Sequence, residues 1–162
     1  IPLRLVGSEM CIRDSAWAWY RVGEAYYKLS NWEKASLCFS EAAVLAPFHL
    51  EIQNKYAMAL LRTNCLLESK KVFEFVISEN PNFEKVYANY GYLLSRLGSY
   101  ELAARQYKKA IALNPDLVHA WLNYAAYYMY KENTSEAKKC LMEVLRIEPE
   151  HRQAKLVLEQ LR

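Results

Sequence analysis

The chain has 162 residues, 53% of them hydrophobic and 24% charged, and its net charge at neutral pH is +3. This composition is enough for a folded core, and so mild a charge does not by itself indicate binding to nucleic acid or to a membrane surface. Four glycines and five prolines leave no flexible linker or low-complexity tail. Thirteen tyrosines and four tryptophans are many for this length, and they need either a core with large spaces to fill or a surface that binds something.

Residues 1–15 do not follow the pattern of the rest of the chain. Their last ten residues, VGSEMCIRDS, resemble translated read-through of a sequencing adapter. We therefore treat residues 1–15 as an artefactual leader and leave them out of the expected fold. The alternative is a native extension in which Ser15 caps the helix that follows.

From Ala16 onward, prolines mark a fixed period. Four of them stand 34 residues apart, at Pro47, Pro81, Pro115 and Pro149. Proline lacks a backbone donor and disfavours helical geometry in the residue before it, so each marks a helix end. The period divides the chain into four repeats, 16–49, 50–83, 84–117 and 118–151. A regular spacing of this kind indicates an internal structural repeat.

Each repeat predicts two helices. Positions 4, 7 and 11 of a repeat lie on one helical face, and so do positions 20, 24 and 27. Position 8 is always small, as Gly23, Ala57, Gly91 and Ala125 show. Small residues there let two antiparallel helices approach closely. Repeat 50–83 is the degenerate copy, because Gln53 stands where the other repeats have an aromatic residue and Ser69 stands where they have alanine.

The repeats resemble tetratricopeptide repeats, whose pattern is W-x2-L-G-x2-Y, then A-x3-F-x2-A, then P. The first repeat matches nearly throughout, with WYRVGEAY at 19–26 followed by Ala35, Phe39, Ala42 and Pro47. The resemblance implies an all-α fold, a right-handed α-solenoid of antiparallel helical hairpins.

The two ends of the repeat array differ. Residues 152–162 predict one more amphipathic helix, in which Lys155 and Glu159 stand where a repeat would pack its next helix. We expect this helix to cap the stack. At the other end, Ala18 and Ala25 occupy positions that would face a preceding hairpin. We therefore expect further repeats upstream of this sequence, or self-association through an open N-terminal face.

The resemblance also assigns positions 2, 5, 6, 9, 12 and 13 of each repeat to the concave surface of the solenoid, and we call these the inner-surface positions. They hold six basic and two acidic residues. The candidate peptide-binding residues are Lys28, Lys55, Arg62, Lys85, Asn89, Tyr92, Arg96, Asn123 and Tyr130. Cationic side chains favour an acidic or carboxylate-terminated segment, and asparagine offers a peptide backbone both donor and acceptor. Basic residues at position 13 also simply complement the helix dipole.

No catalytic arrangement is visible in the sequence. His49 and His151 fall in connections between hairpins, and His119 is alone on a helix face. No cysteine or carboxylate stands at metal-ligand or triad spacing from them. We therefore predict no enzyme activity, no catalytic residues, no metal, no cofactor and no nucleic-acid partner, and no membrane-spanning segment in this stretch.

These observations predict a non-catalytic scaffold that binds a protein or peptide partner, with an acidic segment favoured, in its concave groove. One alternative is that the repeats form the C-terminal arm of a larger enzyme or regulator whose active domain lies upstream. The sequence makes no prediction about the cellular compartment.

Overall fold

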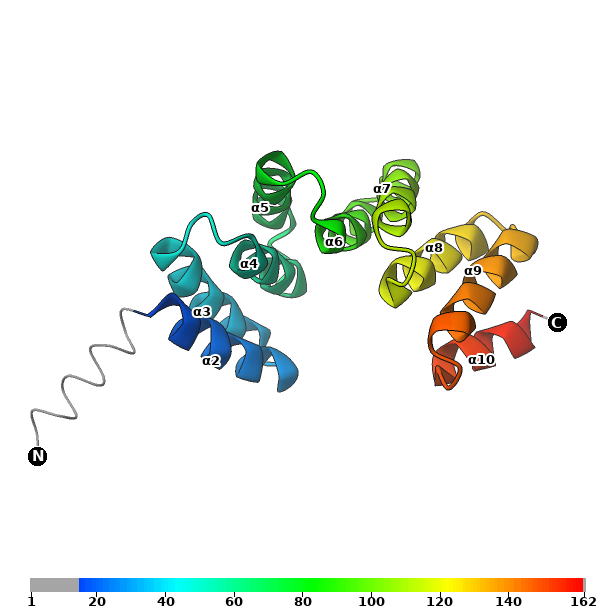
Figure 1. Ribbon diagram of the computed structural model, residues 1–162, viewed down its shortest axis with the longest axis horizontal. Helices are drawn as coiled ribbons and strands as arrows, with labels where there is room; N and C mark the ends of the chain where they lie inside the picture. Colours follow the sequence, from blue (N-terminus) through cyan, green and yellow to red (C-terminus); the bar gives the residue numbers. More distant parts are fainter. Residues whose placement is uncertain (1–14, 162) are drawn as a thin grey trace, which may run out of the picture. The chain divides into compact units, whose positions relative to one another are not determined.

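The computed structural model describes residues 15–161, and all the regular elements in that range are α-helices. They are α2 (Ala16–Lys28), α3 (Trp32–Leu45), α4 (Leu50–Arg62), α5 (Leu66–Glu79), α6 (Glu84–Arg96), α7 (Tyr100–Leu113), α8 (Val118–Tyr130), α9 (Thr134–Ile147) and α10 (Arg152–Gln160) (Figure 1). The prediction of an all-α fold is confirmed. None of the helices between residues 15 and 161 combines the length and the apolar character needed to cross a membrane.

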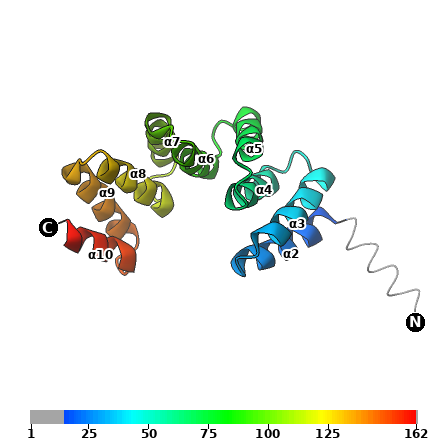
Figure 2. The same cartoon turned by 180° about the vertical axis from the view of Figure 1, so that it is seen from behind.

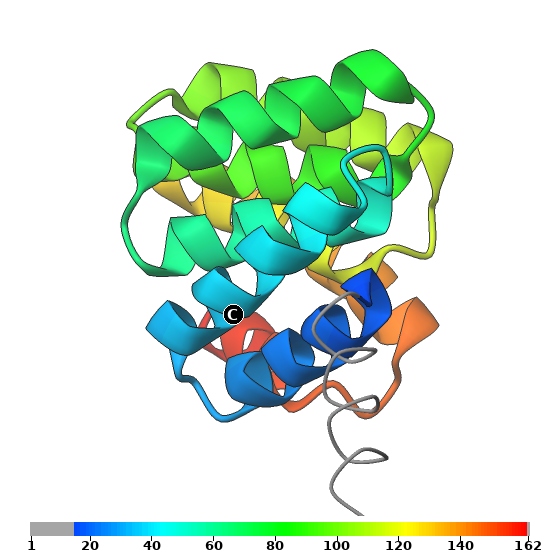
Figure 3. The same cartoon turned by 90° about the vertical axis from the view of Figure 1, so that its left-hand side faces the viewer.

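The chain divides into two compact units, with the division between Asn80 and Pro81. In unit 1, α2 packs against α3, α3 against α4, and α4 against α5; Figure 3 shows α2 and α3 side by side. In unit 2, α6 packs against α7, α7 against α8, α8 against α9, and α9 against α10 (Figure 2). Helix α6 also contacts α8. The helices therefore form hairpins, and within each unit a second hairpin packs on the first.

Glycine at position 8 allows the close approach of the two helices of a hairpin. A Cβ atom added to Gly23 would lie 2.8 Å from the ring of Phe39, and one added to Gly91 would lie 2.5 Å from the ring of Tyr107. Phe39 and Tyr107 are buried. The aromatic residue of the second helix thus lies directly against the glycine of the first, as the small-residue pattern predicts.

The first helix of every hairpin ends in the same turn. One residue in each turn has a positive φ: Ser30 at 57°, Asn64 at 64°, Gly98 at 79° and Glu132 at 56°. In all four turns the next backbone N–H donates a 2.9 Å bond to the carbonyl five residues before it. This is the Schellman arrangement, which satisfies carbonyls at the helix end. Glycine adopts it without strain, whereas Ser30 and Glu132 do not.

The polar residues of the degenerate repeat have local partners. In three repeats the side chain at position 4 donates a hydrogen bond to the carbonyl of the proline six residues before it. These bonds join Gln53 to Pro47 at 2.9 Å, Tyr87 to Pro81 at 2.7 Å and Trp121 to Pro115 at 2.7 Å. The buried Ser69 hydroxyl donates to the carbonyl of Ala57 at 2.8 Å. Repeat 50–83 therefore departs from the sequence pattern while it satisfies its buried polar groups.

Candidate functional site

The predicted site residue Lys55 forms an ion pair within unit 1. The Nζ of Lys55 lies 3.2 Å from Oε1 of Glu24, and the Tyr20 hydroxyl donates to the same oxygen at 3.2 Å. Burial alone would raise the pKa of Glu24, but the bonds from Lys55 and Tyr20 outweigh it and hold that pKa below its usual value. Burial, together with Glu24, raises the pKa of Tyr20 to about 12. Lys55 and Glu24 thus neutralise one another.

Arg62 is also held by neighbours in unit 1. Its Nε donates to the Tyr27 hydroxyl at 3.4 Å, and its guanidinium lies 5.3 Å from the centre of the Trp32 ring. Tyr27 and Trp32 meet edge to face at 4.8 Å. The cation therefore rests on an aromatic pair supplied by α2 and α3. Lys28, in the last turn of α2, is exposed.

In unit 2 the structure brings three predicted site residues together. Tyr92, Asn123 and Tyr130 line a pocket of about 190 Å³ between α6, α7 and α8. The remaining lining residues are Ser95 from α6, Tyr100, Ala103 and Tyr107 from α7, and Ala126 and Tyr127 from α8. Apart from tyrosine hydroxyls, the lining carries no ionisable group. The pocket is a mainly aromatic hollow with an amide and hydroxyl groups around it.

Helical spacing explains how the sequence builds this pocket. The lining residues of α8 stand at 123, 126, 127 and 130, and those of α7 at 100, 103 and 107, so each set lies on one helical face. Ala103 and Ala126 leave room between the larger rings. Two small residues among tyrosines therefore produce a space that a uniformly bulky face would fill.

Tyr107 is the most buried of the tyrosines that line the pocket. It is 2% exposed, and its ring packs against Gly91. Burial raises its pKa, against the opposing effect of a hydrogen bond with Ser95. The phenol is therefore neutral at physiological pH. The position of this ring depends on the hairpin contact itself, because no side chain at Gly91 separates the two helices.

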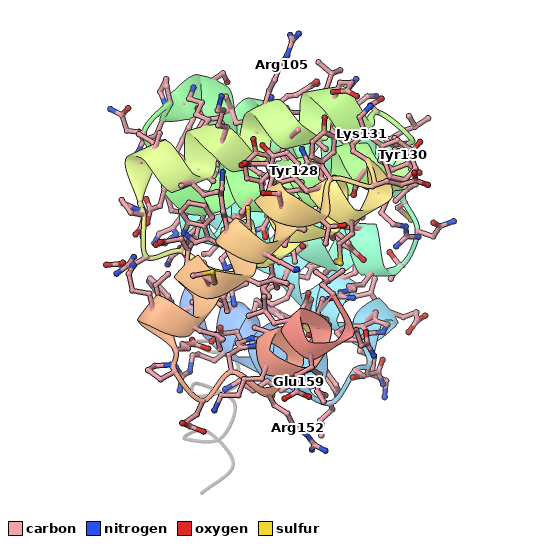
Figure 4. The ribbon with its side chains drawn as sticks, turned by 90° about the vertical axis from the view of Figure 1, so that its right-hand side faces the viewer. Arg105, Tyr128, Tyr130, Lys131, Arg152 and Glu159 are labelled. Atoms are coloured by element: carbon pink, nitrogen blue, oxygen red, sulfur yellow. The ribbon has the colours of Figure 1, made fainter. Side chains whose placement is uncertain are left out.

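The outer wall of the pocket is a stacked pair of rings. Tyr100 and Tyr130 lie 4.2 Å apart between centroids at an interplanar angle of 30°. Tyr127 donates to Oε2 of Glu101 at 2.7 Å, and Lys131 forms an ion pair with Oε1 of Glu101 at 2.7 Å. Tyr130 and Lys131 stand at the end of α8 (Figure 4). These contacts tie α8 to α7 and fix the wall that both helices supply.

The other three predicted site residues lie on α6. Lys85 and Arg96 are exposed near its two ends, and Asn89 is half-buried between them. Arg96 directly follows the lining residue Ser95 and stands one helical turn after Tyr92. None of the three lines the pocket.

Sequence reasoning missed the lining residues Tyr100, Ala103, Tyr107 and Tyr127. The first three belong to α7, a second helix of its hairpin, and the inner-surface positions draw on first helices alone. The high number of tyrosines was the one signal that pointed to the three tyrosines among them, and no signal pointed to Ala103.

No metal site is visible among residues 15–161, where histidine, cysteine and carboxylate side chains form no cluster of three that could hold an ion. Cys38, Cys65 and Cys140 carry free thiols.

The leader prediction for residues 1–15 falls, except for its last residue, outside the described residues. Ser15 itself caps α2, since its side chain accepts a hydrogen bond from the backbone of Ala18.

Family models of the tetratricopeptide repeat match residues 94–161 and residues 16–49. Uncharacterized protein ycf37 of Cyanophora paradoxa is 33% identical over 107 residues, which are 63% of this chain and 62% of that protein. Human tetratricopeptide repeat protein 7A is 24% identical over 80% of this chain and 15% of its own length. Human protein O-mannosyl-transferase TMTC3 is 31% identical over 70% of this chain and 13% of its own length. The chain thus spans less than two thirds of each of these relatives.

Solved structures agree with this family. TTC0263, a thermophilic TPR protein of Thermus thermophilus, has a TM-score of 0.82 at 17% identity, covering 91% of this chain and 81% of that one. YrrB, described as a TPR protein with an unusual peptide-binding site, has a TM-score of 0.70 at 20% identity, covering 90% and 75%. At these identities the likeness establishes the fold alone.

Proposed function

Because this chain belongs to the tetratricopeptide repeat family, we propose that it is a non-catalytic scaffold that binds a segment of a partner protein on the surface formed by α6, α7 and α8. Proteins of this family are generally protein-interaction modules. The observation that carries the proposal is the pocket of about 190 Å³ in unit 2, lined by three of the predicted binding residues. A concave, mainly apolar site with a few polar groups suits a side chain of the partner segment, because the polar groups can bind the backbone next to that side chain.

The charges of unit 2 support an acidic segment. Its inner-surface positions include two basic residues, Lys85 and Arg96, and no aspartate or glutamate. Those of unit 1 include Glu24 and Glu51, and Glu24 already pairs with Lys55. Electrostatic complementarity chiefly governs which partner is chosen and how fast it binds. We therefore assign the acidic preference mainly to α6, where Asn89 also offers donor and acceptor groups to a peptide backbone.

The candidate cations of unit 1 have a smaller part in this proposal. Arg62 can bind a carboxylate only in competition with its contacts to the Tyr27 hydroxyl and the Trp32 ring. Lys28 is exposed in the last turn of α2, next to the negative end of the helix dipole. We therefore assign neither of them a role in fixing the register of a bound segment.

Charge reversal on α6 tests the proposal. Acidic and neutral peptides of about twelve residues would be titrated into the full chain, with binding followed by tryptophan fluorescence. We expect the double variant Lys85→Glu and Arg96→Glu to bind the acidic peptides about tenfold or more weakly and the neutral ones unchanged. The matched control is Lys108→Glu with Arg152→Glu, which changes the net charge equally at exposed positions on α7 and α10. Equal losses in both double variants would contradict the proposed site.

A second candidate function is that of a repeat arm within a longer enzyme or regulator. It is supported by the small share of some relatives that the chain spans. That share is 13% of the O-mannosyl-transferase TMTC3 and 28% of the putative cytochrome c-type biogenesis protein CcmH of Haemophilus influenzae. Sequencing the native gene on both sides of this chain tests it. An adjoining domain with a catalytic arrangement would favour the arm, and a frame confined to these repeats would exclude it.

A further inference from the structure

We infer that the pocket of unit 2 receives one aromatic side chain of the bound segment, and that an acidic residue next to it in the segment faces Arg96. This inference rests on the proposed function and specifies what the site selects. An apolar cavity of about 150 Å³ takes up benzene. A pocket of about 190 Å³ therefore has room for one phenyl or phenol ring.

The walls favour a ring over an aliphatic chain. Five tyrosines line the pocket, and among them Tyr100 and Tyr130 form the stacked outer wall. Aromatic rings prefer offset or edge-to-face partners at centroid separations of about 4.5–7 Å, and such pairs are stabilised beyond the area they bury. A guest ring between these walls meets partners on several sides. A branched aliphatic chain fills the same volume without those contacts.

The polar groups of the pocket suit the backbone next to such a ring. The Asn123 side chain supplies an amide donor and acceptor. The Ser95 hydroxyl on the facing helix donates to the carbonyl of Tyr92 at 2.8 Å, so it can serve the guest only as an acceptor. Because Arg96 stands four residues after the lining residue Tyr92, on the same side of α6, a carboxylate beside the aromatic residue would lie within reach of a guanidinium. Neither Asn123 nor Ser95 carries a negative charge that would repel an acidic segment.

The internal repeat supplies an independent argument, because unit 1 has the corresponding site 68 residues earlier. There Lys55 replaces Asn123 and is paired with Glu24, and Met58 replaces Ala126. Arg62 replaces Tyr130 and covers the Trp32 ring at 5.3 Å. At these three positions unit 1 thus has larger or paired side chains where unit 2 has small or uncharged ones. The pocket of unit 2 therefore depends on side chains that differ from those at the corresponding positions of unit 1.

This comparison also provides the test variant. In Ala126→Met, unit 2 receives the residue that unit 1 carries at the same repeat position. Ala126 is exposed, so the substitution buries no new group in the core. Ala112→Met places the same side chain at an exposed position on α7 that does not line the pocket, and serves as the matched control.

Two measurements on the full chain test the inference. In the first, acidic peptides that differ at one residue (phenylalanine, leucine or alanine) are titrated into the wild type and both variants. We expect the phenylalanine peptide to bind the wild type and Ala112→Met about 10- to 100-fold more tightly than the alanine peptide. In Ala126→Met this preference should disappear while the alanine peptide binds as before. Equal affinities of the three peptides for the wild type would overturn the inference and leave the proposed function standing.

The second measurement uses p-cresol, the free side chain of tyrosine, and follows the ring signals of the chain by NMR. Perturbation of Tyr92 and Tyr130 in the wild type, lost in Ala126→Met, supports an aromatic pocket even if no acidic peptide binds. In that case the acidic preference fails and the aromatic site stands. Absence of any perturbation in the wild type overturns the inference.

Discussion

Replacing Gly91 by alanine is expected to destabilise unit 2, although alanine is the better helix former. The added Cβ would lie 2.5 Å from Cε1 of Tyr107 and 3.2 Å from the carbonyl oxygen of Ala103. Tyr107 is buried, so its ring cannot turn away into solvent. Overpacking typically costs about 1–3 kcal/mol, and a contact of 2.5 Å with a buried ring places this site in the upper half of that range, at about 2–3 kcal/mol. The gain in helix propensity from glycine to alanine offsets about 1 kcal/mol of this cost. We expect a net loss of about 1–2 kcal/mol.

Thermal unfolding followed by circular dichroism measures this loss. For a chain of this length, each kcal/mol shifts Tm by roughly 2–4 °C, so a decrease of about 2–8 °C is expected. Repeat 118–151 suggests the compensating change, because it pairs Ala125 with Leu141 at the corresponding positions. In a double-mutant cycle, Gly91→Ala combined with Tyr107→Leu should cost less than the sum of the two single changes. A Gly91→Ala variant as stable as the wild type would refute the close-approach reasoning.

The remaining predictions concern the turns, the degenerate repeat and the ion pair of unit 1. Glu132→Gly should raise the free energy of unfolding by about 0.5–1 kcal/mol, because φ is 56° there, and urea denaturation measures it. Gln53→Leu should lower the free energy of unfolding by about 1–3 kcal/mol, since the carbonyl of Pro47 loses its donor, and the same assay checks it. Because the pKa of Glu24 is lowered in the folded state, its bond to Lys55 stabilises above the unfolded pKa and is lost as the pH falls through the folded one. Lys55→Gln should therefore reduce the difference in urea midpoint between neutral and strongly acidic solution, by a small amount because both groups are partly exposed.

The hairpin fold could be predicted because the same residue types recur at the same positions of all four repeats. Proline after the second helix and a small residue at position 8 can each be read without coordinates. The turn at position 15 was not predicted. Its residues are Ser30, Asn64, Gly98 and Glu132, which share a backbone conformation and no side-chain chemistry.

The bond at position 4 was missed for a related reason. Gln53 looks like a loss of pattern when side chains are compared by size and hydrophobicity. It is equivalent to Tyr87 and Trp121 once the shared donor to the proline carbonyl is known. A pattern of residue types conceals this equivalence, because three unlike side chains deliver an N–H or O–H to one place.

The candidate site was predictable only in part. Tyr92, Asn123 and Tyr130 follow from the inner-surface positions, but the pocket exists because Ala126 is small and because α7 supplies rings from its own face. Similarly, the cations of unit 1 can be located in the sequence, whereas the pairing of Lys55 with Glu24 depends on which rotamers the packed hairpins allow. Charge counted along a sequence therefore overstates the charge that a ligand meets.

Tyr107 takes part both in the hairpin contact with Gly91 and in the lining of the pocket. Its neighbours therefore allow the effect of a substitution on stability to be separated from its effect on binding. In Gly91→Ala the displaced Tyr107 ring is itself a lining residue, so the variant should lose affinity for an aromatic peptide as well as stability. Gly23→Ala forces the same kind of collision, with Phe39 at 2.8 Å, but in unit 1, far along the chain from the pocket residues. It should lower Tm and leave the preference for the phenylalanine peptide unchanged when both variants are assayed well below their Tm. Equal losses of that preference in both variants would mean that general destabilisation weakens binding, and that Tyr107 does not shape the pocket.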